Sequence, residues 1–241
     1  MDRSSWFRIA PLVFAAAGCV ENENSLVFIQ NQFVTRMNNC AVTPALGIGL
    51  SGGLLDVGLV EAGAPGYTMA PILRNNFADR TMVTGTNIDN IIITGTDIEV
   101  QPPPALAAML PRGQRNYFVP ALGGGIAVNT TVGFLVEALP RQVALQLASG
   151  VTGTEPDPPR VNLRFRVVGQ WNGSTLSTPW LNFPIKLCQF CLSNVFPCPA
   201  GGLSAESIAL GGCNPAQDEP VTCCEANGNL FCGPAVPKKA T

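Results

Sequence analysis

The stretch that decides the fold is VNLRFRV, residues 161–167. Apolar and polar residues alternate along it, so one set of side chains faces a core and the other faces water, as in a half-buried β-strand. Asn-Gly at residues 172–173 then predicts a hairpin, because both residues tolerate the positive φ of a type I′ turn. The returning stretch LNFPIKL, residues 181–187, repeats the alternation, and Pro184 within it predicts an edge strand or an unpaired side at that position.

Short apolar stretches bounded by turns continue this pattern toward the N-terminus. Residues 25–35 and 67–77 are expected to be strands, and residues 105–110 are expected to form one short helical turn. The apolar runs 132–139 and 141–148 lie on either side of a proline. A helix could be drawn through the second run, but the proline and the β-rich surroundings favour a strand.

These patterns divide the chain into one domain and a tail. Composition agrees with many short strands and turns, because the 241 residues include 25 glycines and 21 prolines and only 12% are charged. We expect an all-β fold, with an antiparallel, immunoglobulin-like β-sandwich at residues 26–187 and a disulfide-rich, irregular tail at residues 188–241. Leu, Ile and Val are sparse in the tail, so cross-links would take the place of a hydrophobic core.

The first 18 residues have the features of a secretory signal peptide: basic residues, then an apolar run too short to span a bilayer, then small residues. Ala17 and Gly18 before Cys19 resemble the lipobox of bacterial lipoproteins, in which the cysteine is lipidated and becomes the mature N-terminus. Residues 19–25 would then be a lipidated tether. Because Ala16 stands where leucine is usual, cleavage after Ala17 to give a soluble secreted protein is the alternative.

Cysteine parity supports lipidation, because nine is odd and an odd cysteine in an exported chain needs a separate role. Assigning Cys19 to lipid leaves eight cysteines, enough for four disulfides. These eight are Cys40, Cys188, Cys191, Cys198, Cys213, Cys223, Cys224 and Cys232. The first and last strands of such sandwiches often lie side by side and parallel, which would join Cys40 to Cys188 or Cys191.

The C-x2-C spacing of Cys188 and Cys191 has two other interpretations. Cytosolic zinc sites use this spacing, but the signal sequence places the chain in an oxidising compartment, where thiols form disulfides. Thioredoxin-like catalysis needs the motif at a helix N-terminus in a βαβ unit, whereas Cys188 ends a strand-like run. We therefore expect structural disulfides, and neither a metal nor a cofactor.

The chain contains no histidine, which excludes a Ser-His-Asp or Cys-His catalytic site. TGTNID at residues 84–89 recurs as TGTDIE at residues 94–99, and residues two apart project from the same face of a strand. An acidic face beside an exposed tryptophan, Trp171 or Trp180, would suit carbohydrate binding or hydrolysis. The simpler interpretation is two strands with Thr-Gly-Thr turns and solvated acidic faces. The candidate ligand-binding residues are Asp89, Asp97, Glu99 and Trp171.

The net charge of −2 gives no basic face of the kind that binds nucleic acid, so no nucleic-acid partner is expected. GCNPAQD at residues 212–218, FCL at residues 190–192 and the pair Cys223 and Cys224 resemble the tails of uncharacterised bacterial surface lipoproteins of the myxobacterial type. That group has no assigned activity. The resemblance implies a diacylglycerol thioether and an N-acyl group on Cys19, and Val20 beside it favours the outer membrane.

Two functions are therefore expected. The first is a non-catalytic, lipid-anchored protein of the cell envelope, which binds the membrane through its N-terminal lipid and has a structural role or binds an unknown envelope or extracellular partner. The alternative is an envelope carbohydrate-binding module or hydrolase that uses Asp89, Asp97 and Glu99. A concave acidic site beside a tryptophan would favour the alternative, and a flat, solvated strand face would oppose it.

Overall fold

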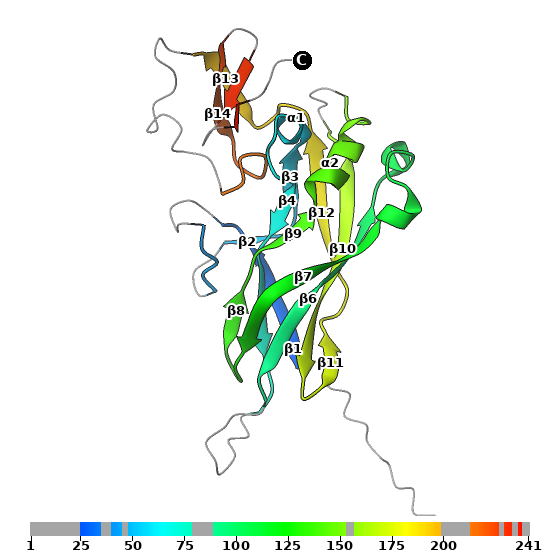
Figure 1. Cartoon of the computed structure of the whole chain (residues 1–241), viewed down its shortest axis with the longest axis vertical. Coiled ribbons are helices and arrows are strands. Elements are labelled where there is room, and N and C mark those ends of the chain that lie inside the picture. The colour runs from blue at the N-terminus through cyan, green and yellow to red at the C-terminus, as the bar shows by residue number, and fades with distance from the viewer. Residues whose placement is uncertain are drawn as a thin grey trace, which may run out of the picture.

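The described chain is mostly β-structure (Figure 1). The computed structural model describes residues 25–34, 40–44, 48–78, 89–152, 157–198, 213–226, 229–232 and 236–237. The expected signal peptide, Cys19 and the tether up to residue 24 lie outside this part. The described residues form four sheets, so the prediction of an all-β fold with antiparallel pairing is confirmed at this level. In the same residues, no helix combines the length and apolar character needed to cross a membrane.

The largest sheet has the order β3-β12-β10-β6-β7, with β11 paired to β10. Its strands are β3 (Gly53–Asp56), β6 (Ile91–Gln101), β7 (Asn116–Ile126), β10 (Arg160–Trp171), β11 (Ser174–Ser177) and β12 (Leu181–Cys188). The alternation predicted for β10 is confirmed, because Val161, Leu163, Phe165 and Val167 are buried while the polar residues between them are half-buried. All its pairings are antiparallel except β3 with β12.

The hairpin predicted after β10 is present. Asn172 and Gly173 have φ values of 46° and 79°, as a type I′ turn requires. The returning chain is divided into two strands: β11 pairs with the end of β10, and β12 pairs with its beginning. Pro184 lies just beyond the part of β12 that pairs with β3, so its missing N–H leaves no gap in that ladder.

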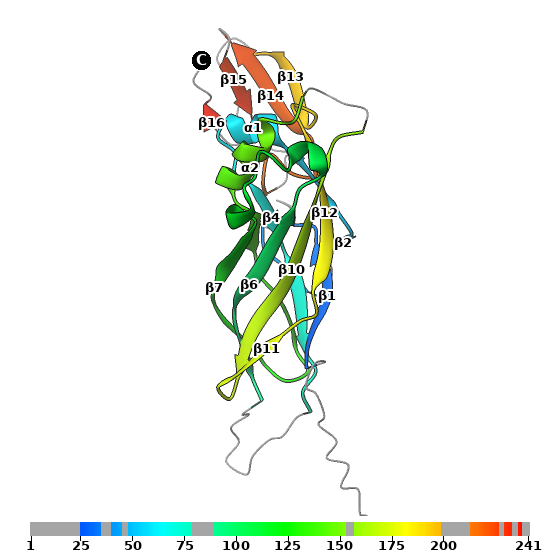
Figure 2. The same cartoon turned by 90° about the vertical axis from the view of Figure 1, so that its right-hand side faces the viewer.

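A second, four-stranded antiparallel sheet faces one half of the large sheet (Figure 2). Its strands, in the order β2-β1-β5-β8, are β1 (Leu26–Gln32), β2 (Gly49–Leu50), β5 (Pro71–Asn75) and β8 (Thr131–Gly133). Leu26 and Leu73 from this sheet pack against Ile91 and Val167 from the large one. Burial of these side chains holds the two sheets together, at about 1.5–3 kcal/mol for each large aliphatic group.

The other half of the large sheet is covered by helices and a two-stranded sheet. These elements are α1 (Val57–Glu61), α2 (Arg141–Ala148), β4 (Tyr67–Met69), β9 (Val136–Leu139) and the 3₁₀ turns Pro104–Leu106 and Arg112–Gln114. The first 3₁₀ turn confirms the expected helical turn. The larger hydrophobic core lies here, between α1, α2 and the large sheet.

The expectation of a strand at residues 141–148 is wrong, because these residues form α2. Pro140 precedes the first turn, where its fixed φ and missing N–H cost nothing, and its carbonyl accepts from Ala144 N at 3.0 Å. Ala144, Leu147 and Ala148 are buried at helical spacing. Packing of this face outweighs the β-rich surroundings that favoured a strand.

The expected turn at Thr94-Gly95-Thr96 is also wrong. β6 runs through these residues without reversing, and the irregularity is a bulge in the register between Ile93 and Gly95. A bulge accommodates an extra residue and leaves the strand continuous. Residues 84–88, the first copy of the repeat without Asp89, lie outside the described residues.

The described part of the tail is regular, not irregular as expected. It forms a four-stranded sheet at the end of the molecule near α1, with β13 and β14 parallel (Figures 1 and 2). Its strands are β13 (Ser193–Pro197), β14 (Val221–Ala226), β15 (Asn229–Cys232) and β16 (Val236–Pro237). Residues 213–218, between β13 and β14, return to the domain and pair with β3.

Candidate functional site

The acidic residues of β6 form a charged ladder on the outer face of the large sheet. Asp97 and Glu99 share this face as predicted, and each pairs with an arginine of β10. Arg166 Nε lies 2.8 Å from Asp97 Oδ2, and Arg164 Nη1 lies 3.3 Å from Glu99 Oε2. The guanidinium carbons of both arginines lie 4.7 and 4.8 Å from the centre of the Trp180 ring, a cation–π geometry.

Asp89 does not belong to this face. It precedes β6 and is only 2% exposed, and its Oδ1 accepts from Trp171 Nε1 at 3.2 Å. Trp171 stacks on Phe77, with ring centroids 4.6 Å apart. The structure therefore separates the predicted ligand-binding residues into two groups: Asp89 with Trp171 at the start of β6, and Asp97 with Glu99 toward its end.

The charged ladder is poorly suited to acid–base catalysis or to sugar binding. Both carboxylates are already paired with arginine, and both side chains are 31% exposed on a strand face. A carboxylate held in an ion pair is a poor general base, and a general acid needs an environment that keeps it protonated. The guanidinium groups also occupy the Trp180 face that a sugar ring would stack on. This is the solvated strand face that opposes the hydrolase interpretation.

Disulfides join the tail to the domain and to itself. The described bridges are Cys40–Cys213, Cys188–Cys191 and Cys198–Cys224, and Cys223 is also disulfide-bonded. The expected bridge from Cys40 to Cys188 or Cys191 is wrong. β1 belongs to the sheet β2-β1-β5-β8, whereas the parallel neighbour of β12 is β3 in the large sheet. The end of β1 therefore reaches the returning tail segment instead of the end of β12.

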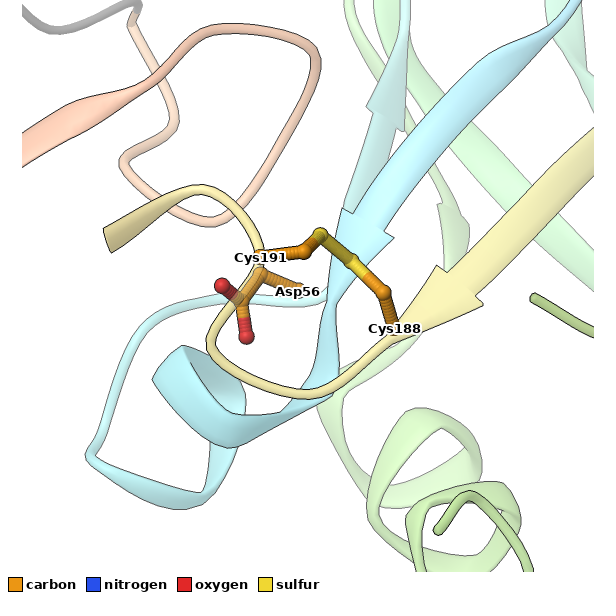
Figure 3. Close-up of side chains that lie close together, drawn as sticks. All are labelled: Asp56, Cys188 and Cys191. Atoms are coloured by element: carbon orange, nitrogen blue, oxygen red, sulfur yellow. A yellow bond between two sulfur atoms is a disulfide. The ribbon is translucent and has the colours of Figure 1, made fainter. Parts of the chain in front are cut away.

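Asp56 is the buried centre of the region where β3, α1 and the C-x2-C loop meet (Figure 3). Its Oδ1 caps α1 by accepting from Gly58 N at 3.0 Å and Leu59 N at 3.2 Å. The same oxygen accepts from Phe190 N at 2.8 Å, and Oδ2 accepts from Leu192 N at 2.9 Å. One carboxylate thus joins the first turn of a helix to a loop more than 130 residues later.

The electrostatics of Asp56 reflect two opposing causes. Burial raises the pKa of its carboxyl above the ordinary value, and the four backbone hydrogen bonds act in the opposite direction. A carboxylate oxygen of Asp56 and the sulfurs of Cys188 and Cys191 all lie within 4.8 Å of one another. Zinc binding would require both sulfurs as thiolates, and the disulfide uses both.

A second polar cluster joins residues 213–218 to the domain. Asp218 accepts from Tyr67 Oη at 2.6 Å and from Leu54 N at 2.7 Å, and the Gln217 amide makes two hydrogen bonds to the Thr68 backbone, of 2.8 and 2.7 Å. Burial, and then the neighbouring carboxylate of Asp218, raises the pKa of Tyr67. Gly53 is required beside this cluster, because a Cβ there would overlap the Tyr67 hydroxyl.

Sequence reasoning did not identify Asp56, Tyr67 or Asp218. Asp56 lies in a glycine-rich stretch with no recognisable motif, and its partners on the C-x2-C loop are distant in the chain. The only local signal is the position of an Asp before the apolar residues Val57 to Val60, which is typical of a helix N-cap. This signal would predict that Asp56 caps a helix, but it would not predict that Asp56 contacts the C-x2-C loop.

Comparison with known proteins adds no family: no protein-family model matches the chain, and no curated protein matches it.

Proposed function

We propose that this protein is a lipid-anchored component of the bacterial cell envelope, of the myxobacterial surface-lipoprotein type, with a structural or partner-binding role. One observation carries the proposal. Among the residues that the structure describes, seven cysteines are disulfide-bonded, and the three described bridges account for six of them. The seventh is Cys223, and Cys232 stands opposite it in the register of β14 and β15. We infer a bridge between these two cysteines, which would leave Cys19 for the lipid.

The arrangement of the domain supports attachment from its N-terminus. β1 starts at the end of the molecule where β11 lies, and the tail sheet lies at the opposite end (Figure 1). Five residues lie between Cys19 and Ser25, so the six steps from one to the other span at most about 20 Å. A lipid on Cys19 would hold the β11 end near the membrane and would present the disulfide-rich end to a partner. We also propose that the two facing sheets form the immunoglobulin-like sandwich, anchored in the outer membrane.

The test is the intact mass of the protein extracted from membranes. We expect a chain beginning at Cys19 with a diacylglycerol and an N-acyl group, and we expect Cys19→Ala to move the protein to the soluble fraction. Asn22→Ala, in the tether, is the matched control and should stay in the membrane. An unmodified product beginning at Gly18 would overturn both the anchor and the parity argument.

A further inference from the structure

The C-x2-C loop places a disulfide against a buried carboxylate at the edge of the molecule. Asp56 is 0% exposed and Cys188 is 3% exposed, whereas Cys191 is exposed. The carboxylate lies within 4.8 Å of both sulfurs, on the inner side of the loop (Figure 3). The pair therefore consists of one exposed cysteine and one buried cysteine, with an ionisable group beside them.

Hydrogen bonds that do not involve the disulfide also hold the loop. Asp56 holds the backbone N–H groups of Phe190 and Leu192, one between the two cysteines and one directly after them. Phe190 is kept in the left-handed region, with a φ of 55°. Opening the S–S bond would leave these hydrogen bonds in place, and the two sulfurs would remain neighbours.

The buried sulfur also has a partner for its reduced form. Cys188 Sγ lies 3.7 Å from the carbonyl oxygen of Leu55, within range of a thiol S–H donor. A buried thiol at this position would thus be hydrogen-bonded. The site accommodates both oxidation states of the pair.

We propose that Cys188 and Cys191 form a redox-active pair that exchanges with external thiols, with Cys191 as the sulfur under attack and Asp56 as the proton donor and acceptor for Cys188. The substrate class is a low-molecular-weight thiol or its disulfide. The proposal does not depend on the lipid anchor. It differs from a thioredoxin-like site, because a buried carboxylate from β3 takes the place of the helix N-terminus at the motif.

In the reductive direction, an external thiolate attacks Cys191 Sγ, so a mixed disulfide forms and the bond to Cys188 breaks. The Cys188 sulfur leaves as a thiolate and takes up a proton from solvent, which Asp56 relays; burial raises the pKa of the Asp56 carboxyl and so favours this role. A second thiolate attacks the sulfur of the external thiol, and Cys191 leaves as a thiolate that takes a proton from solvent. Two thiols become one disulfide, and the protein gains two electrons and two protons.

The first experiment equilibrates the folded, exported protein with glutathione buffers of graded composition, followed by alkylation and peptide mapping. We expect Cys188 and Cys191 to become alkylated while Cys40–Cys213 and Cys198–Cys224 stay oxidised in the same sample. The two other bridges are internal controls. If the three bridges are reduced together, or the C-x2-C pair is reduced only after unfolding, the pair is structural and the proposal fails.

The second experiment compares single-serine variants with a coloured aromatic disulfide reagent. Cys188→Ser leaves the exposed thiol and should react at least about tenfold faster than Cys191→Ser, which leaves the buried one. Equal rates would contradict the assigned direction of attack. Asp56→Asn, checked by circular dichroism, should slow reduction of the wild-type pair by about 10²-fold. An unchanged rate in a folded Asp56→Asn variant would remove Asp56 from the mechanism. If that variant does not fold, the rates of Cys188→Ser and Cys191→Ser still test which sulfur is attacked.

Discussion

At the residue scale, burial and not residue type decides what an acidic side chain does in this protein. Asp97 is partly exposed and pairs with one arginine, an arrangement that contributes about 0–1 kcal/mol. Asp56 is buried and accepts from four backbone N–H groups, each of which would be left without an acceptor, at about 1–3 kcal/mol, if the carboxyl were removed. The residue that matters more for the fold is therefore the one without a sequence motif.

The two tyrosines of the chain give a pH prediction at this scale. Burial is the main cause of a raised pKa at both Tyr67 and Tyr117, and the nearby carboxylates of Asp218 and Glu137 act in the same direction. The folded protein therefore keeps both hydroxyls protonated above pH 10.0, the ordinary value, where an unfolded chain ionises them. This stabilisation is complete below pH 10 and is lost as the pH rises above it.

A spectrophotometric titration checks this prediction. We expect no tyrosinate absorbance near pH 10 while the circular dichroism is native, and we expect absorbance and unfolding to appear together at higher pH. Urea-unfolded protein is the control and should titrate near pH 10. A native protein that titrates near pH 10 would show that the two hydroxyls are accessible.

At the scale of elements, the hairpin is the part that local sequence determines most completely. Gly173 has a φ of 79°, and a Cβ there would meet nothing within 4 Å, so only the backbone conformation disfavours a side chain. Gly173→Ala should lower the free energy of unfolding by about 1 kcal/mol. Asn172→Gly, at the neighbouring position with positive φ, is the control and should change it by a few tenths at most. Urea unfolding measures both, and an unchanged midpoint for Gly173→Ala would argue against the left-handed turn.

The contrast between this hairpin and α2 shows which parts of the fold could be predicted. The alternation of β10 and the Asn-Gly turn express short-range rules, and both are confirmed. Residues 141–148 have an ambiguous local pattern, and contact with the core selects the helix. The contact of Asp56 with the C-x2-C loop and the bridge from Cys40 to Cys213 depend on which strands become neighbours, which no local pattern contains.

At the scale of the whole molecule, the disulfides differ in how much of the chain they enclose. Cys40 and Cys213 are 173 residues apart, whereas Cys188 and Cys191 are three apart. In the chain-entropy account, the long loop contributes about 5 kcal/mol and the short one about 2 kcal/mol. Among the three described bridges, Cys40–Cys213 therefore contributes the most to stability.

Paired alanine variants measure this difference. Cys40→Ala with Cys213→Ala should lower the free energy of unfolding by about 2–5 kcal/mol, and Cys188→Ala with Cys191→Ala by about 2 kcal/mol or less. The second pair is the matched control, because it also removes two sulfurs. Equal losses in urea unfolding would mean that local packing at each bridge, and not the enclosed loop, determines its contribution.

The segment 216–218 has a consequence for the time course of biogenesis. Asp56 N donates to Ala216 O at 2.8 Å, and Asp218 N donates to Leu54 O at 3.0 Å, so this late segment occupies the outer side of β3. A nascent chain makes β3 early and residues 216–218 more than 150 residues later. During that interval β3 offers unpaired backbone groups to any neighbouring chain. This edge of β3 thus stays open to pairing with other chains until residues 216–218 dock on it.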